Sequence, residues 1–249
     1  MRQIPLVLAI SGGGSTAEAI LRAWSKGKLP GIKPALVIAS KPGIQGINRA
    51  ISAGVKTEDV VVISRKAYAW DQTFGDDILW ECVKRGIKKG EAIWGQYGWL
   101  PKTPWGVINH FRFTVNQHNG PIDPGRPGFG GKGMHGEATH WAVLEFRRRT
   151  GMANPWTEAT AQLVDEEYDK GQLWGTSQVP VFEEDTPEIL AARVLPKEHL
   201  LQIAVLDFLS REENQSPHMR REPLIRPEHI NVLEEVKREA AERFSAIHK

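Results

Sequence analysis

The sequence is poor in cysteine and tyrosine, and its apolar runs are short. The single cysteine, Cys82, excludes a disulfide framework and a zinc site built from four thiolates. No apolar run approaches the roughly 18 residues of a membrane span, and the first residues show no signal-peptide cleavage pattern, so we expect a cytoplasmic protein without a membrane partner. The excess of positive charge is small. The sequence has 32 Lys and Arg and 30 Asp and Glu, a net charge of +2, which argues against a nucleic-acid partner.

Tryptophan, glycine and proline are abundant by comparison: nine Trp stand against three Tyr, with 24 Gly and 16 Pro in 249 residues. Because the Gly and Pro do not form low-complexity tracts, they indicate shaped loops and pockets. The length predicts one large domain with an appended element. We place the domain at residues 1–210, a polar linker at 211–227 and an amphipathic helix at 228–249. The apolar stripe of that helix comprises Ile230, Leu233, Val236, Ala240, Phe244 and Ile247.

Short apolar runs alternate with helical patterns in the first part of the chain. Residues 6–10, 35–39 and 60–63 are typical of buried strands, and residues 17–24 and 47–53 between them are typical of helices. This βαβαβ alternation predicts an α/β fold with a Rossmann-like, mostly parallel sheet and helices on both faces. Further helices are predicted at 76–88, 136–149 and 186–209, and further strands at 92–96, 113–117, 160–164 and 178–182.

A glycine loop, Ser-Gly-Gly-Gly-Ser-Thr, follows the first predicted strand. Glycines let backbone amides approach an anion, and the N-terminus of the next helix adds unpaired N–H groups and a favourable dipole. The spacing matches neither a Walker A loop nor the dinucleotide fingerprint. We therefore predict a phosphate site, with a tight turn that binds nothing as the alternative. The residues of this site are Gly12, Gly13, Gly14, Ser15 and Thr16, and Ser15 or Thr16 is the expected N-cap.

Asn116 and His118 stand two residues apart in a predicted strand, so their side chains share one face near the strand's carboxyl end. A histidine beside an amide could supply an oxyanion donor and a general acid or base. Asp169 lies in a turn that ends in glycine and could orient that histidine. Taken alone, each has a structural alternative, namely a hydrogen-bonding histidine and a solvated acidic turn.

Four motifs in series resemble the 10-formyltetrahydrofolate-dependent formyltransferases, most closely their glycinamide ribonucleotide branch. They are the glycine loop, residues 97–104 (Tyr-Gly-Trp-Leu-Pro-Lys-Thr-Pro), residues 116–118 (Asn-Gln-His) and residues 169–171 (Asp-Lys-Gly). Further matches follow in order as far as Glu198-His199, and the resemblance covers about residues 6–209.

The resemblance implies an enzyme that transfers a formyl group from its co-substrate 10-formyltetrahydrofolate to the amine of a phosphorylated small molecule, with glycinamide ribonucleotide of purine biosynthesis as the first candidate. Asn116 and His118 would donate to the oxyanion of the intermediate, while Asp169 would keep His118 protonated and relay a proton through water. The glycine loop would hold the phosphate and Glu198 the ribose, and no metal is required. The implied folate site comprises Gly98, Trp99, Leu100, Lys102, Val164, Tyr168 and Gly171.

Departures from the family pattern concern the acceptor side. A Gly- and Pro-rich stretch, residues 119–134, replaces a shorter loop after the histidine, and Gln162 replaces a family histidine, which would weaken a second proton relay. Another acceptor amine, such as an amino sugar nucleotide or a hydroxylated ornithine, is therefore an alternative. Hydrolysis of the formylfolate and a phosphate-binding module without catalysis are further alternatives. We expect small-molecule partners only, and a monomer or homodimer.

Overall fold

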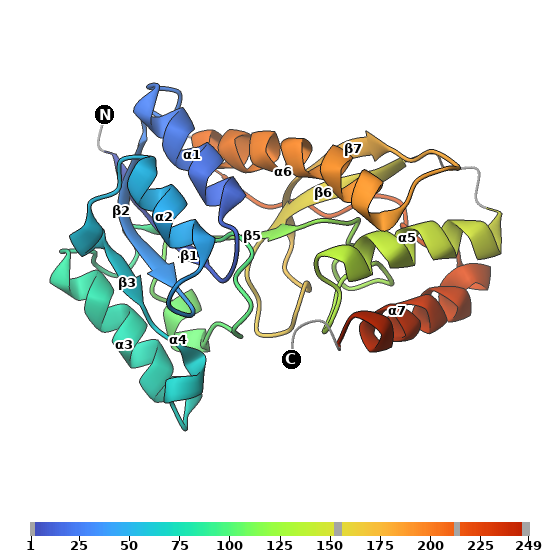
Figure 1. The fold of residues 1–249 in the computed structure, drawn as a ribbon, viewed down its shortest axis with the longest axis horizontal. Coiled ribbons are helices and arrows are strands. Elements are labelled where there is room, and N and C mark those ends of the chain that lie inside the picture. Colours follow the sequence, from blue (N-terminus) through green and yellow to red (C-terminus); the bar gives the residue numbers. More distant parts are fainter. Residues whose placement is uncertain (1–2, 152–155, 212–214, 246–249) are drawn as a thin grey trace. The chain divides into compact units, whose positions relative to one another are not determined.

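The computed structural model describes residues 3–151, 156–211 and 215–245 (Figure 1). The chain forms two compact units, each assembled from separate segments. Unit 1 comprises Met1–Gln117, Leu163–Glu166 and Gln202–Gln215, and unit 2 comprises His118–Gln162, Glu167–Leu201 and Ser216–Lys249. The strands of the mixed sheet follow the order β3-β2-β1-β4-β5-β6-β7.

Unit 1 is built on parallel strands, as the βαβαβ alternation predicts. β1 (Ile4–Ile10) lies between β2 (Ile32–Ala39) and β4 (Ile93–Gln96), β2 pairs with β3 (Val60–Val62), and β4 pairs with β5 (Phe113–His118), whose last residue begins unit 2. The connecting helices are α1 (Ser15–Ser25), α2 (Gln45–Ser52), α3 (Asp71–Lys84) and α4 (Trp105–Ile108), with short 3₁₀ turns at Thr57–Asp59 and Arg65–Ala67.

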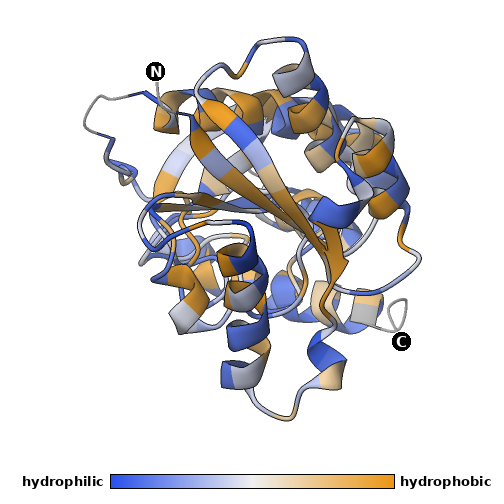
Figure 2. Cartoon of the chain, turned by 90° about the vertical axis from the view of Figure 1, so that its left-hand side faces the viewer, coloured by the Kyte–Doolittle hydropathy of each residue, from blue (hydrophilic) through white to orange (hydrophobic). Residues whose placement is uncertain are grey.

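Side chains alternate between the two faces of β1, and the two faces contact different helices. Val7 packs in a buried cluster with Phe74 and Ile78 of α3, whereas the Ile10 side chain reaches Gly46 of α2. Helices therefore cover both faces, as expected for a doubly wound sheet. Figure 2 shows the orange, hydrophobic residues concentrated along the strands.

Unit 2 contains the antiparallel pair β6 (Trp156–Gln162) and β7 (Leu173–Pro180). Its helices are α5 (Glu137–Thr150), most of α6 (Pro187–Leu209) and α7 (Ile230–Ser245), which follows a 3₁₀ turn at Pro227–His229. These elements share one buried apolar cluster, which includes the α7 stripe residues Leu233, Val236 and Ala240. The C-terminal helix therefore packs within its own chain, against α5. Ile247, the last residue of the predicted stripe, lies outside the described residues.

Local details differ from the sequence predictions. The N-cap of α1 is Gly14 in a left-handed conformation (φ 68°), not Ser15 or Thr16, and no side chain caps the helix. α3 begins at Asp71 rather than at residue 76 and ends at Lys84 rather than at residue 88. Both β6 and β7 begin several residues earlier than predicted, because they pair with each other rather than following the apolar pattern alone. No helix in the described part of the chain is long and apolar enough to cross a membrane.

Candidate active site

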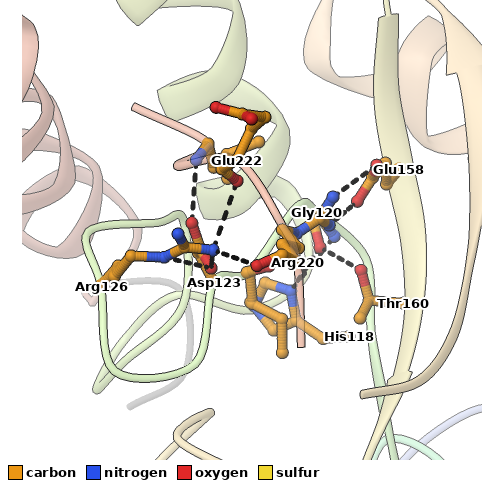
Figure 3. Close-up of polar contacts among 10 residues, drawn as sticks. His118, Gly120, Asp123, Arg126, Glu158, Thr160, Arg220 and Glu222 are labelled. Carbon is orange, nitrogen blue, oxygen red and sulfur yellow. Dashed lines mark hydrogen bonds and ion pairs between the residues drawn. The ribbon is translucent and has the colours of Figure 1, made fainter. Parts of the chain in front are cut away.

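His118 ends β5 with a buried side chain and both ring nitrogens in contact with backbone groups. The Gly120 N–H lies 3.2 Å from Nδ1, and the Gly120 carbonyl oxygen lies 3.0 Å from the same atom. The Gly120 backbone can thus donate to Nδ1 of the neutral ring or accept from Nδ1 of the imidazolium. Thr160 Oγ1 donates to that carbonyl at 2.8 Å and holds it in place (Figure 3). These contacts fix the orientation of the His118 ring.

The Nε2 atom of His118 faces two oxygens. The carbonyl oxygen of Met134 lies 3.1 Å away, within hydrogen-bond distance. Asp169 Oδ2 lies 3.6 Å away, an ion-pair distance rather than a hydrogen bond. The structure therefore brings together the predicted His118 and Asp169, and it adds a backbone acceptor that the sequence did not indicate.

Asp169 is held from two sides. Its backbone has φ 58°, the sole positive φ of a non-glycine residue among those described, in a region that Asp tolerates better than most residues. Gly131 N–H donates to Oδ2 at 2.9 Å, and Gln162 Nε2 donates to Oδ1 at 2.7 Å. Gln162 thus orients the carboxylate directly.

The Gly-rich stretch after His118 forms an ordered loop, residues 119–136, that lies against Asp169. A Cβ atom on Gly130 would stand 2.5 Å from the Asp169 Cβ, so only glycine permits this approach. Within the loop, Phe129 N–H donates to the Pro121 carbonyl at 2.9 Å, and Phe129 is buried. The loop therefore contributes to the core of unit 2 as well as to the site.

Asn119 closes the loop by joining its start to α5. Its Nδ2 group donates to the Gly136 carbonyl at 2.7 Å and lies 2.9 Å from His140 Nε2. Burial and the nearby His118 lower the pKa of His140 to about 4. A neutral His140 can accept the second Asn119 hydrogen, so the structure gives this histidine a positioning role.

The glycine loop in unit 1 leaves the first amides of α1 without a side-chain partner at the N-cap. Gly14 and Gly46 approach so closely that a Cβ on Gly14 would stand 2.6 Å from the Gly46 Cα. The Nη1 atom of Arg49 lies 3.9 Å from the Cβ position of Gly13. Gly12 and Gly13 are exposed, whereas Thr16 is buried. The loop thus presents backbone amides and one nearby cation, which suits an anion.

Ser11, just before these glycines, joins the glycine loop to the predicted folate segment. The Leu100 N–H donates to Ser11 Oγ at 2.9 Å. Gly98 has φ 73°, and Leu100 and Lys102 are exposed beyond it. Trp99 lies in the core instead, stacked on Phe74 with ring centroids 6.3 Å apart. A role for Trp99 as a pocket wall stays a prediction.

The other predicted residues lie on several elements. Val164 is half-buried, and its N–H donates to Thr114 Oγ1 at 3.0 Å. Tyr168 is exposed and Gly171 buried in the Asp169 turn. Asn116 is half-buried on β5, beside Gln96 of β4, and Glu198 is buried on α6. The roles expected for these residues stay predictions.

Two cavities adjoin the predicted positions, each within one unit. In unit 2, Tyr168 and Asp169 line a cavity of about 270 Å³ together with the 119–136 loop and Lys237 of α7. In unit 1, Lys102 lines a cavity of about 490 Å³ with residues of α3 and α4. In the described ranges, no cluster of three or more His, Cys, Asp or Glu side chains could hold a metal ion.

The sequence did not predict the contacts that four residues make at these sites: Arg49, Gly131, His140 and Gln162. Gln162 was noted by position, but its partner Asp169, like the Asn119 partner of His140, becomes apparent only in the folded chain. Arg126 forms an ion pair with the buried carboxylate of Asp123. Gly131 acts through its amide, which leaves no side-chain signal in a sequence.

Comparison with known proteins connects this geometry to a class of enzymes. The glycinamide ribonucleotide transformylase 1 structure from Symbiobacterium toebii shares the fold, with a TM-score of 0.70 and 23% identity over 88% of this chain and 93% of that one. The corresponding Geobacillus kaustophilus structure has a TM-score of 0.68 and 26% identity over 84% of this chain and 100% of that one. The fold is thus that of these formyl-transferring enzymes. No protein-family model matches the chain.

Sequence relatives give the narrower assignment. The chain is 31% identical over 212 residues to the chloroplastic phosphoribosylglycinamide formyltransferase of Arabidopsis thaliana, covering 85% of this chain and 67% of the relative. The Vigna unguiculata enzyme of the same name is 33% identical over 215 residues, 85% of this chain and 62% of the relative. The chain thus spans about two thirds of the length of these plant relatives. It belongs to the phosphoribosylglycinamide formyltransferase family.

Proposed function

We propose that the chain transfers a formyl group from 10-formyltetrahydrofolate to the amine of glycinamide ribonucleotide, a step of purine nucleotide synthesis. The observation that carries this proposal is the buried pair of His118 and Asp169, with Nε2 and Oδ2 3.6 Å apart, in a chain of this family. The transfer needs a donor to the oxygen that gains charge and an acceptor for the proton that the amine loses. His118 and Asp169 are groups of these two kinds.

His118 is the proposed donor. Its Nε2–H group, now directed at the Met134 carbonyl, would donate a hydrogen bond to the oxygen that becomes negative. A preorganised donor of this kind typically contributes about 10²–10³-fold in rate. Asn116, two residues earlier on the same strand, is the proposed second donor. The Asp169 carboxylate would stabilise the imidazolium and receive, through water, the proton that the amine loses as its nitrogen bonds to the formyl carbon. When the bond from that carbon to the folate nitrogen breaks, the same proton would pass to the folate nitrogen and tetrahydrofolate would leave.

The substrate phosphate is proposed to bind at Gly12, Gly13, Gly14, Ser15 and Thr16. The uncapped N-terminus of α1 and the exposed glycine amides support this, because both favour an anion. Arg49 adds a positive charge beside Gly13. Glu198 is proposed to hold the ribose hydroxyls.

The residues proposed to bind the folate are, in unit 1, Gly98, Trp99, Leu100, Lys102 and Val164 and, in unit 2, Tyr168 and Gly171. Within unit 1 the proposal rests on Leu100, which is 47% exposed and offers apolar surface to a flat heteroaromatic ring. The bound folate would supply the formyl carbon, while the protein's part is to hold it, exclude water and move protons. No metal takes part in this proposal.

An acceptor panel tests the proposed function. The full-length chain is incubated with 10-formyltetrahydrofolate and, separately, glycinamide ribonucleotide, an amino sugar nucleotide, hydroxyornithine or no amine, and release of tetrahydrofolate is followed spectrophotometrically. We expect release with glycinamide ribonucleotide and none without an amine. Turnover with a different amine only would replace the acceptor, and release without an amine would indicate a hydrolase.

Three coarser proposals accompany this function. Residues 1–210 are proposed to form the formyltransferase domain, joined through 211–227 to the C-terminal helix. The protein is proposed to act in the cytoplasm as a monomer or homodimer. Light scattering of the full chain measures the oligomeric state, and limited proteolysis shows whether cleavage within residues 211–227 separates the C-terminal helix from the rest of the chain.

A further inference from the structure

Two arginines join the 119–136 loop to the chain that follows α6, all within unit 2. Arg220 forms a bidentate pair with Glu158 of β6, and its Nε donates to the Ile122 carbonyl at 2.8 Å (Figure 3). In return, Arg126 of the loop donates to the Arg220 carbonyl at 2.8 Å while its guanidinium binds Asp123 at 2.9 Å. We call these four residues, Asp123, Arg126, Glu158 and Arg220, the clamp.

The carboxylates of the clamp are removed from water. Glu158 is 2% exposed, and the Asp123 side chain is 1% exposed. The second oxygen of Asp123 accepts the Leu224 N–H at 2.8 Å, so this carboxylate also binds the segment after α6. Buried carboxylates need such partners, because an unpaired buried charge is strongly destabilising. The clamp is therefore a specific, fully paired feature of unit 2 and not a pair of solvated surface contacts.

Two short contacts connect the clamp to Asp169 of the His118–Asp169 pair. Arg220 holds the carbonyl of Ile122, and the Ile122 side chain lies against Gly130, where a Cβ would stand 3.0 Å from Ile122 Cγ2. Gly130 in turn packs on Asp169, and the next residue, Gly131, donates its N–H to the Asp169 carboxylate. The position of Ile122 thus sets how Gly130 and Gly131 meet Asp169.

We propose that Arg220 is a positioning residue for the His118–Asp169 pair. Its guanidinium fork binds Glu158 and the Ile122 carbonyl at once, and this arrangement holds the 119–136 loop against Asp169. Arg220 lies beyond residue 209, outside the part of the chain that carries the motif resemblance. The segment after α6 therefore serves the reaction rather than merely extending the fold, an inference that rests on the proposed function.

The Arg220→Lys variant tests the proposal. A lysine keeps the positive charge beside Glu158 but cannot reproduce the fork that also reaches Ile122. We expect kcat to fall about tenfold to hundredfold, as a misplaced catalytic group allows, with KM for both substrates within about twofold. In glycine-selective ¹⁵N spectra, we expect the Gly131 amide to exchange with solvent at least about tenfold faster, since its bond to Asp169 opens more often. Arg238→Lys, which alters an exposed ion pair on α7, is the matched control and should change neither quantity.

A second variant separates positioning from stability. If Arg220→Lys does not fold, Arg220→Met combined with Glu158→Gln removes the buried charge as well as the arginine, so that stability returns. We expect this double variant to fold and still to show low kcat and fast Gly131 exchange. Wild-type kcat together with wild-type Gly131 exchange in a folded variant would overturn the proposal. The exchange measurement needs no substrate, so a wild-type protein inactive on glycinamide ribonucleotide would refute the proposed function without affecting this result.

Discussion

The Nε2 atom of His118 lies closer to the Met134 carbonyl oxygen, at 3.1 Å, than to Asp169 Oδ2, at 3.6 Å. The histidine therefore donates to the backbone while a carboxylate stands at ion-pair distance. A backbone carbonyl is a neutral acceptor, so it holds the proton less strongly than a carboxylate would. This arrangement leaves the proton available for a substrate oxygen, with Asp169 close enough to stabilise the charge on the ring.

Replacing either member of the pair is expected to abolish most turnover. His118→Ala removes the donor, and Asp169→Asn keeps the shape and tolerates φ 58° but removes the negative charge. Each should lower kcat by about 10²–10⁴-fold. Steady-state kinetics measure this, with circular dichroism melting to show that the fold is kept. Near-normal turnover of either folded variant would remove the proposed mechanism.

Gly130→Ala should disturb the site through crowding alone. The new methyl group would stand 2.5 Å from the Asp169 Cβ, so the loop or the Asp169 turn must move. Overpacking of this kind typically costs about 1–3 kcal/mol of unfolding free energy, and we expect kcat to fall at least about tenfold with it. Gly106→Ala, where nothing lies within 4 Å of the added methyl, is the control. Unchanged kcat in Gly130→Ala would show that this contact does not position Asp169.

The buried His140 should make stability depend on pH. Its pKa is lowered to about 4 in the folded chain from its ordinary value of 6.5, so the unfolded state binds more protons between these two pH values. Stability should therefore be lost progressively as pH falls from about 6.5 toward 4, by roughly 2–4 kcal/mol in total. Urea unfolding of wild type and His140→Gln at pH 7.5 and pH 5 measures the difference. Glutamine can still accept from Asn119 but does not titrate, so equal losses in both proteins would contradict the assignment.

Arg49→Met should weaken binding of the phosphorylated acceptor. A charge-assisted hydrogen bond to a phosphate is worth about 1.5–3 kcal/mol, so KM for glycinamide ribonucleotide should rise about tenfold to hundredfold with a smaller change in kcat. Arg22→Met removes the other arginine that pairs with Glu18 and serves as the control. If both variants raise KM equally, Arg49 acts through general charge and not at the phosphate.

Much of unit 1 follows from local sequence pattern. Apolar runs such as 6–10 are buried strands because only a parallel sheet covered on both faces removes them from water, and the glycines after β1 permit the turn into α1. Local pattern failed where pairing or packing decided the outcome. β7 extends back to Leu173 because β6 offers partners along its length, and α3 begins at Asp71 although its apolar positions start later.

The sequence by itself indicated the family and singled out the glycine loop and the catalytic candidates Asn116, His118 and Asp169, because those features reside in side-chain identity and spacing. The tertiary structure decided that the 119–136 loop is ordered, that Gln162 and Gly131 hold Asp169, and that Arg220 meets Glu158 from 62 residues away. These contacts involve backbone groups and residues distant in sequence, whose proximity depends on how the whole of unit 2 folds. The net charge of +2 does not reveal these contacts either, because each carboxylate in the clamp is paired with an arginine and the two charges cancel in the sum.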